Sequence, residues 1–274
     1  MKRILLLMVL MNLCINAQTN RFIYELQFKR DSAQSNFDKL NFVLDVNPKD
    51  VKFYEYYYLE SDSINKVKGN YEHQYGGDFP TVKRERNSFR NQNYELINFD
   101  MFSYTSEDKI NWSLLSETKR VGENTLQKAT ANFGGRSWTA WFNKEINIQE
   151  GPYKFNGLPG LIFELRDTKS NFIFTLVKNN KLKETYDTTG IVETFYGRKP
   201  LVISEKIREK KKKEFFNDPL ANMRNNFKEN MQGQMFVMGT KITNIEQFND
   251  LSKKLQEMLR KTNNPIELNK AVKY

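Results

Sequence analysis

Alternation of hydrophobic and polar residues predicts that the chain, up to about residue 200, is built mainly from β-strands. Apolar side chains occupy every second position in 22–28 and in 40–46, which is the period of a strand with one buried face. The run 51–60 carries aromatic residues on both faces, and it predicts a strand that is covered on both sides or lines a cavity. Strand-like segments separated by turn signals follow one another from 117 to 178, which is typical of an antiparallel sheet.

The stretch 61–92 interrupts this pattern. It has no clear period, contains Gly76, Gly77 and Pro80, and carries the charged cluster 83–86. Glycine, proline and polar residues favour turns and solvent-facing loops. We therefore expect an exposed polar excursion here, built as a long loop or a β-hairpin.

After Pro200 the period of the apolar residues becomes helical. Ser204 precedes a segment free of Gly and Pro and is the expected N-cap of a first helix. Pro219 suits the first turn of a second helix. Asn244, followed three residues later by Gln247, has the pattern of a capping box for the last helix.

These patterns divide the chain into three regions. Residues 1–17 form a leader, 18–200 an antiparallel β domain, and 201–274 a helical region that packs on the sheet or projects from it. The fold class that follows is mainly β (α+β): a single curved antiparallel sheet or half-open barrel with C-terminal helices.

The stretch 151–167, GPYKFNGLPGLIFELRD, combines repeated turn signals with a core strand. Proline fixes its own φ and glycine accepts a positive φ, so 158–161 is expected to form a type II turn. Leu161, Phe163 and Leu165 then alternate with other residues and predict a strand with one fully apolar face. The residues expected to shape the loop are Gly151, Pro152, Gly157, Pro159 and Gly160.

The hexapeptide GLPGLI at 157–162 is accompanied by further motifs, among them VKFYEYYY at 51–58 and GRSWTAW at 135–141. Together these motifs extend over most of 24–167 and resemble the GLPGLI family of secreted proteins from Bacteroidetes bacteria. The resemblance implies export to the periplasm or cell envelope. It implies no established activity, because the family is one of unknown function.

The N-terminus has the parts of a secretory signal peptide. Lys2 and Arg3 precede an apolar run at 4–15, and Ala17 offers a small residue for cleavage. The apolar run is too short to cross a bilayer, so we expect no transmembrane span. Cys14 raises lipidation as an alternative, but the residue before it is not small. Cleavage after Ala17 would give a periplasmic, envelope-associated or secreted protein without a disulfide.

Basic residues exceed acidic ones, with 43 Lys and Arg against 33 Asp and Glu and a formal net charge of +10. Such an excess can mark a nucleic-acid-binding protein. Here both signs are spread along the chain, so we interpret the charges as a solvated surface and expect no nucleic-acid partner. The densest basic cluster is 210–213, whose lysines would point all round a helix.

Few residues suit metal or acid–base chemistry. His73 is the only histidine, and Cys14, the only cysteine, would leave with the leader. Zinc sites of Cys and His and Cys–His catalytic pairs are therefore not expected. We predict no metal, no cofactor and no catalytic residue.

Two alternatives stay open. A hydrolase could use paired carboxylates, for which the candidates are Glu60, Asp62, Glu164 and Asp167. The spacing of Met231, Met235 and Met238 suggests a Cu(I) site, although flexible methionines also fill gaps in cores.

The favoured function is non-catalytic binding. Aromatic side chains supply large contact areas with a polar handle, which suits a pocket or groove. The protein is expected to hold a hydrophobic or extended ligand, or an envelope protein, in the concavity of its sheet. The residues expected to line this site are Tyr56, Tyr58, Trp138, Trp141, Tyr153 and Leu158.

Overall fold

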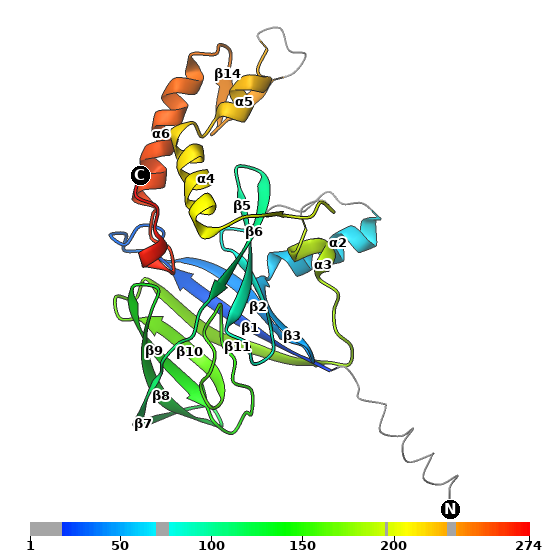
Figure 1. Ribbon diagram of the computed structural model, residues 1–274, viewed down its shortest axis with the longest axis vertical. Helices are drawn as coiled ribbons and strands as arrows, with labels where there is room; N and C mark the ends of the chain where they lie inside the picture. The colour runs from blue at the N-terminus through cyan, green and yellow to red at the C-terminus, as the bar shows by residue number, and fades with distance from the viewer. Residues whose placement is uncertain (1–17, 70–76, 195–196, 229–233) are drawn as a thin grey trace, which may run out of the picture.

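The computed structural model describes residues 18–69, 77–194, 197–228 and 234–274. The largest unit of the fold is one sheet of 12 strands, in the spatial order β12-β6-β5-β4-β3-β2-β1-β11-β10-β9-β8-β7 (Figure 1). The expected mainly β protein with C-terminal helices is confirmed. In the described part of the chain the sheet stays open, and it is mixed because β12 runs parallel to β6. The strands are β1 (Thr19–Phe28), β2 (Asp38–Val46), β3 (Asp50–Glu55), β4 (Thr81–Glu85), β5 (Arg90–Ile97), β6 (Asp100–Glu107), β7 (Ser113–Val121), β8 (Asn124–Phe133), β9 (Arg136–Asn143), β10 (Leu161–Asp167), β11 (Phe172–Leu182) and β12 (Leu201–Val202).

The first half of the chain forms the strands from the middle of the sheet to one edge, and the second half forms the strands from the opposite edge back to the middle. Strands β1 to β6 follow one another toward one edge, whereas β7 lies at the opposite edge and β8 to β11 return to pair β11 with β1. Residues 108–112 alone join β6 to β7, and a linker of this length spans at most about 20 Å. In a flat sheet, these two strands would lie about 48 Å apart. The sheet must therefore curl, so that its two halves face each other like the walls of a bowl.

The bowl is filled by the protein's own loop 144–160, which joins β9 to β10 and which we call the plug loop. Phe155 and Leu158 of this loop are fully buried, and Tyr153 is 4% exposed. The Phe155 ring packs edge-on against Trp138, with 4.6 Å between the ring centroids. Burying side chains of this size contributes about 1.5–3 kcal/mol each. The plug loop is therefore part of the main core.

The end of the plug loop is tighter than expected. The Gly160 amide donates a 2.8 Å hydrogen bond to the Leu158 carbonyl, which closes a three-residue turn about Pro159 instead of the expected type II turn. Gly160 has φ +155°, and a side chain at this position would collide with the Asn143 carbonyl. The glycine is therefore required by close approach of the backbone as well as by its φ.

Strand β10 also departs from simple alternation. A bulge between Ile162 and Glu164 interrupts its pairing with β9. As a result Leu161 and Ile162 are both fully buried, whereas Phe163 is half-buried. The expected simple alternation along one apolar face is thus wrong, because the bulge buries Leu161 and Ile162 together, while Phe163 is only partly buried and packs against the main core.

Two helices cover the outer face of β1 to β3, and these are α2 (Tyr57–Lys68) and α3 (Thr189–Val192) (Figure 1). They enclose a second hydrophobic cluster, separate from the main core. Its buried members are Ile23, Val43, Tyr54, Ile191 and Val192.

The expected strand 51–60 is wrong in its second half. Strand β3 ends at Glu55 and α2 begins at Tyr57, because Tyr56 and Tyr58 fold back and pack against the second cluster. A local aromatic pattern could not reveal this, because the cluster is completed by α3, more than a hundred residues later in the chain.

The expected exposure of 61–92 holds for only part of its described residues, such as 66–69 and 85–87. Asp62 and Asn65 are buried on α2, while β4 and β5 are interior strands of the sheet. Polar residues in these strands are buried because they meet polar partners, as Arg84 does at Glu150. His73 lies outside the described residues.

The described residues between 204 and 261 leave the sheet as an arm, and 262–274, which we call the tail, return to it (Figure 1). The arm has a hydrophobic cluster of its own, centred on Phe248 and Leu251 of the last helix. Within the described residues, the structure has no helix with the length and apolar character that a membrane crossing requires. The elements are α4 (Glu205–Asn217), α5 (Ala221–Asn226), β13 (Met235–Val237), β14 (Thr240–Ile242), α6 (Gln247–Lys261) and the 3₁₀-helix η1 (Leu268–Lys270).

The helix caps of the arm follow the sequence prediction. The Ser204 hydroxyl accepts a hydrogen bond from the Ile207 amide at the start of α4. Asn244 and Gln247 each accept a hydrogen bond from the backbone amide of the other, the reciprocal arrangement of a capping box. These caps satisfy amides at the first turns of α4 and α6.

Candidate functional site

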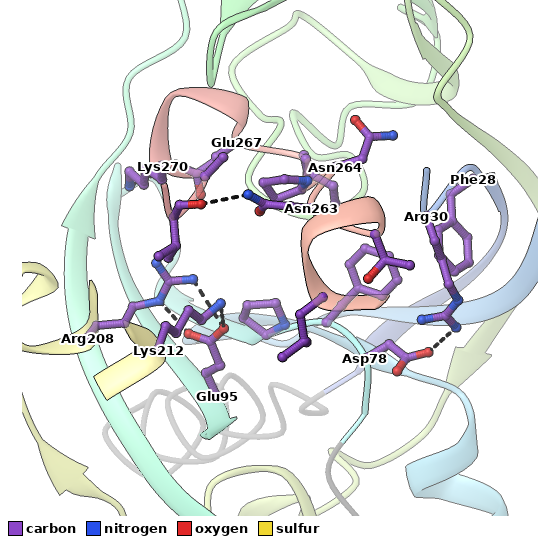
Figure 2. Close-up of a pocket in the computed structure, with 18 of the residues that line it drawn as sticks. Phe28, Arg30, Asp78, Glu95, Arg208, Lys212, Asn263, Asn264, Glu267 and Lys270 are labelled. Carbon is purple, nitrogen blue, oxygen red and sulfur yellow. Dashed lines mark hydrogen bonds and ion pairs between the residues drawn. The ribbon is translucent and has the colours of Figure 1, made fainter. Parts of the chain in front are cut away.

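A pocket of about 310 Å³ lies where the open end of the bowl meets the arm and the tail, and we call it the rim pocket (Figure 2). Strand ends of the sheet form one wall, α4 a second and the tail a third. Its aromatic lining consists of Phe28, Phe79, Tyr104, Tyr153, Phe172 and Tyr274. Its charged lining consists of Arg30, Asp78, Glu95, Arg208, Lys212, Glu267 and Lys270.

One charged group of the rim pocket joins β5 to α4. Arg208 and Lys212 are one helical turn apart, so both side chains leave α4 on the same face. The Arg208 guanidinium contacts both oxygens of Glu95, and Lys212 Nζ lies 2.5 Å from Glu95 Oε1. The single negative charge of Glu95 is thus paired with two positive charges, so this wall of the pocket carries one excess positive charge.

The same contacts fix the ionisation of Glu95. Burial by itself would raise the pKa of this carboxyl, but Lys212 and Arg208 hold the pKa below its usual value. The group therefore stays ionised at neutral pH. The other lysines of the basic cluster 210–213 point away from the pocket and pair with Glu209 and Glu214.

A second charged group fastens the plug loop to the tail. The Lys154 side chain is fully buried, and its Nζ lies 2.6 Å from Glu267 Oε1 and 3.1 Å from Asp108 Oδ2. Tyr153 donates a 2.6 Å hydrogen bond to the same Glu267 oxygen, and Lys270 lies 2.8 Å from the other. Burial would raise the pKa of Glu267, but Lys154 and Lys270 lower it to about 2.

The tail is also bound to the turn between β8 and β9. The Arg136 guanidinium donates hydrogen bonds to Asn264 Oδ1 at 2.5 Å and to the Pro265 carbonyl at 2.8 Å. The Asn269 amide donates a 3.1 Å bond to the Gly134 carbonyl. Side chains at Gly134 or Gly135 would press on the tail. The tail wall of the rim pocket is therefore held in one place.

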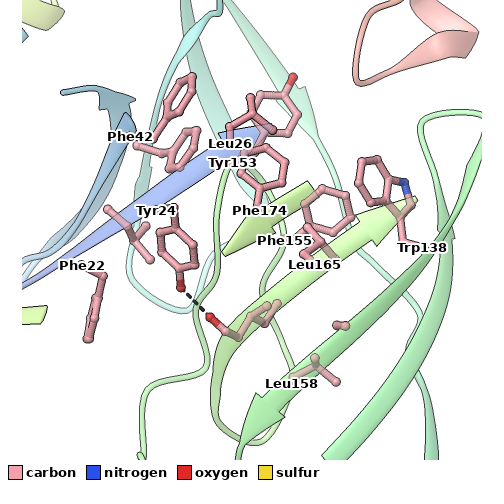
Figure 3. Close-up of a cluster of buried hydrophobic side chains, with 14 of the residues drawn as sticks. Phe22, Tyr24, Leu26, Phe42, Trp138, Tyr153, Phe155, Leu158, Leu165 and Phe174 are labelled. Carbon is pink, nitrogen blue, oxygen red and sulfur yellow. Dashed lines mark hydrogen bonds between the residues drawn. The ribbon is translucent and has the colours of Figure 1, made fainter. Parts of the chain in front are cut away.

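The six residues expected to bind a ligand are not brought together. Tyr153 lines the rim pocket, whereas Trp138 and Leu158 are buried in the main core, 1% and 0% exposed (Figure 3). Trp141 lies on another surface of the sheet, with Lys119 Nζ 4.6 Å from its ring centroid. Tyr56 and Tyr58 accompany α2, where the Tyr58 hydroxyl accepts a hydrogen bond from the Gly77 amide.

The motif residues shape the plug loop rather than the rim pocket. A side chain at Gly151 would collide with Ile162, and Gly157 has φ +88°. The Pro152 carbonyl accepts a hydrogen bond from the Phe155 amide. Together with the turn at Pro159 and Gly160, these features place the aromatic side chains of the loop inside the bowl.

The candidate carboxylates of a hydrolase lie on two elements, Glu60 and Asp62 on α2 and Glu164 and Asp167 on β10. Asp62 contacts Lys66 and Tyr186, while Glu164 lies 2.5 Å from Lys119 Nζ. Asp167 is buried against Arg136 and accepts a hydrogen bond from the Phe172 amide. Glu60 is exposed on α2. No two of these four carboxylates line the rim pocket, so the pairing that such a mechanism needs is not formed there.

The methionines of the possible copper site also separate. Met235 packs into the core of the arm, whereas Met238 is 51% exposed in the turn after β13. Met231 lies outside the described residues. Among the residues that are described, no three His, Cys, Asp or Glu side chains gather in a way that would hold a metal ion.

Sequence reasoning missed the charged residues of the rim pocket. Glu95 and Arg208 are 113 residues apart, and Lys154 and Glu267 are separated by the same number. A local signal existed only for Arg208 and Lys212, whose spacing places them on one face of a helix. Their common partner is visible only in the folded protein.

Comparison with known proteins gives a short family match and a similar fold. Residues 134–164 match the family described as "Protein of unknown function (Porph_ging)". No curated protein matches the chain. Structures of a protein named PNGF-II, in space groups C2 and P21, are similar with TM-scores of 0.53 and 0.51 at 13% and 14% sequence identity.

These structural matches cover 72% and 71% of this chain and 33% of PNGF-II, so the chain spans about a third of that protein's length. At such identities the likeness shows the fold alone. The family match is confined to the turn after β8, strand β9, the plug loop and the start of β10. Over these residues the chain is similar to a family of unknown function.

Proposed function

We propose that this protein is a non-catalytic binding module that holds a small amphiphilic anion in the rim pocket. The observation that carries the proposal is the pairing of an aromatic floor with a wall where two cations share one carboxylate. Phe28, Phe79 and Phe172 would contact the apolar part of the ligand, and Lys212 its anionic group.

The size and composition of the pocket support this proposal. Its volume of about 310 Å³ falls at the lower end of the range of small-molecule sites. Aromatic rings bind apolar groups with little loss of side-chain entropy. The Lys212 side chain is 26% exposed, so its ammonium group retains donors for a ligand while it contacts Glu95.

The ionisation of the pocket favours binding over catalysis. Glu95 and Glu267 each contact two cations and have lowered pKa values. A general acid needs a carboxyl that keeps its proton near neutral pH. These two carboxylates instead contribute fixed charge, which suits recognition of an ionic group.

The test uses two fluorescent probes that differ by one charge. The anionic dye 1-anilinonaphthalene-8-sulfonate and its uncharged analogue N-phenyl-1-naphthylamine share the same apolar rings. We expect both to bind the native protein, and Lys212→Ala to weaken the anionic dye about tenfold, because a charge-assisted hydrogen bond contributes about 1.5 kcal/mol. Binding of the uncharged dye should be unchanged by this substitution.

Two further variants test the apolar contact and the specificity of the Lys212 effect. Phe79→Ala should weaken both dyes, because it removes a ring from the floor. Lys213→Ala is the matched control, because this lysine pairs with Glu209 outside the pocket and should leave both affinities unchanged. Equal loss of anionic-dye binding in Lys212→Ala and Lys213→Ala would contradict the proposal, and turnover of an ester or glycoside in the pocket would favour the carboxylate hydrolase.

We also propose that the protein is exported and that it belongs with the GLPGLI proteins it resembles. The support is the leader 1–17, which lies outside the described residues, and the motif at 157–162. Intact-mass measurement of protein from an envelope fraction should show a chain that begins after Ala17. A retained leader or an acylated Cys14 would overturn this proposal.

A further inference from the structure

A second pocket, of about 280 Å³, lies between the plug loop and the turn that joins β4 to β5, and we call it the turn pocket. The Gly157 amide donates a 3.0 Å hydrogen bond to the Gln149 carbonyl, so both ends of the segment 149–157 lie at this pocket. Tyr153, in the middle of the same segment, lines the rim pocket. The plug loop thus contributes to two pockets, which share no lining residue.

A buried ion pair lines the turn pocket. Arg84 of β4 contacts Glu150 of the plug loop, and their side chains are 2% and 7% exposed. Burial and the charge of Arg86 lower the pKa of Arg84 to about 10, so the guanidinium is charged at neutral pH although its lost hydration is not fully replaced. Because burying an ion pair costs much of what the attraction returns, stability alone does not explain this pair.

Side-chain amides form much of the remaining lining. Asn147 and Gln149 are exposed, so their amide groups are open to a ligand. Asn156 is 5% exposed and donates a 3.3 Å hydrogen bond from Nδ2 to the Lys154 carbonyl, which leaves its amide oxygen to accept. Each amide carries both donors and an acceptor. The turn pocket therefore presents donors and acceptors side by side.

Phe89 supplies an apolar surface to this polar pocket. Its half-buried ring lies next to the plug loop, with Cε1 3.9 Å from the position that a Cβ atom would take at Gly157. Because glycine has no side chain, it leaves this part of the ring uncovered. Aromatic rings offer a flat apolar surface against which a ligand can stack.

We propose that the turn pocket binds a carbohydrate, with the hydroxyl groups of one sugar unit on the Arg84–Glu150 pair and the amides, and its C–H face on Phe89. A hydroxyl group both donates and accepts, so it can accept from Arg84 and donate to Glu150. An oxyanion offers acceptors only, and the Glu150 carboxylate would repel it. The volume of the pocket, close to the lower end of the range of small-molecule sites, suits a single sugar unit.

The test measures binding of the methyl β-glycosides of glucose, galactose and mannose by saturation-transfer NMR, with sodium sulfate as a competing anion. We expect at least one glycoside to bind and sulfate not to displace it. The double variant Asn147→Ala, Gln149→Ala should weaken this binding about tenfold, because two hydrogen bonds are lost. Both side chains are exposed, so the melting temperature should stay close to that of the wild type.

Two controls locate the binding. The double variant Asn179→Ala, Asn180→Ala removes two exposed amides from β11, outside both pockets, and should leave the affinity unchanged. Lys212→Ala alters the rim pocket alone and should also leave it unchanged, so this result does not depend on the ligand proposed for that pocket.

Three outcomes would overturn the proposal. The first is that none of the three glycosides binds, which would leave the turn pocket to water. The second is displacement of the glycoside by sulfate, which would make the pocket an anion site. The third is an equal affinity in the wild type and in Asn147→Ala, Gln149→Ala, which would place the sugar elsewhere.

Discussion

The interior of the bowl and the rim pocket use the same kinds of aromatic side chain for different purposes. Inside the bowl, Trp138, Phe155 and Phe174 are at most 1% exposed and belong to one hydrophobic cluster that includes the plug loop. At the rim, Phe79 and Tyr153 adjoin an opening bordered by ion pairs. Aromatic residues in this protein therefore indicate a binding site only where charged groups and open volume accompany them.

The two regions also differ in how they tolerate charge. The bowl is mainly apolar inside, and its buried charges are paired, as Lys154 is with Glu267 and Asp108 and Arg84 is with Glu150. The rim pocket instead contains charge at every wall. Substitutions in each region test this difference.

The largest effect on stability is expected from truncation of Phe155 in the plug loop. Phe155→Ala should lower the free energy of unfolding by about 3–5 kcal/mol, because it leaves a cavity in a closely packed core. Urea denaturation measures this change. Phe99→Ala, which truncates an exposed ring, should change it by less than about 0.5 kcal/mol. Similar losses in the two variants would show that the plug loop is not part of the core.

The second experiment removes the charge that fastens the tail. The pKa of Glu267 is lowered from 4.5 to about 2, so the folded state favours the ionised carboxylate. This contributes up to about 3 kcal/mol of stability above pH 4.5, and the contribution is lost as the pH falls through 2. Glu267→Gln should therefore be much less stable than wild type at pH 7, with the difference shrinking toward pH 2.

The control for Glu267→Gln is Glu205→Gln. The Glu205 side chain is 45% exposed and forms an ion pair with Lys270. Surface ion pairs contribute little, so this change should lower stability by less than about 1 kcal/mol. A pH-independent difference for Glu267→Gln would contradict the assignment of the ion cluster.

The third experiment concerns Glu55, which is buried on β3 and has the opposite shift. Burial raises its pKa from 4.5 to about 7, although its carboxylate accepts a 3.0 Å hydrogen bond from the Phe79 amide. The folded state thus favours the protonated form, and stability falls as the pH rises from 4.5 through 7. Glu55→Gln should remove this slope and gain about 1–3 kcal/mol at pH 8, measured by thermal unfolding across the range. A slope that persists in the variant would assign the titration to another group.

The smallest effect is expected at the turn that ends the plug loop. Gly160→Ala should destabilise the protein by at least about 1 kcal/mol more than Gly122→Ala. Both glycines have positive φ, but only at Gly160 would the added methyl group meet backbone atoms, those of Asn143 and Lys144. Equal melting temperatures for the two variants would argue against the close approach.

Most local elements of the fold could be predicted from the amino-acid sequence. Alternating residues located β1, β2, β8 and β9, and Ser204 and Asn244 located the starts of the helices, because hydrogen bonds of caps and turns involve residues three or four positions apart. The sequence also located the plug loop, whose glycines and prolines are local necessities.

The contacts of the plug loop and the position of the rim pocket depend on pairing between residues that are far apart in the sequence. Lys154, which lies between Tyr153 and Phe155, is buried only because Glu267 returns to it from the far end of the chain. Tyr57 begins a helix because a cluster completed by Ile191 covers that part of the sheet. Such partners are more than a hundred residues apart, and the periodicity of the sequence does not indicate that they meet. The local pattern therefore gives the elements, while the pairing of distant charges builds the rim pocket.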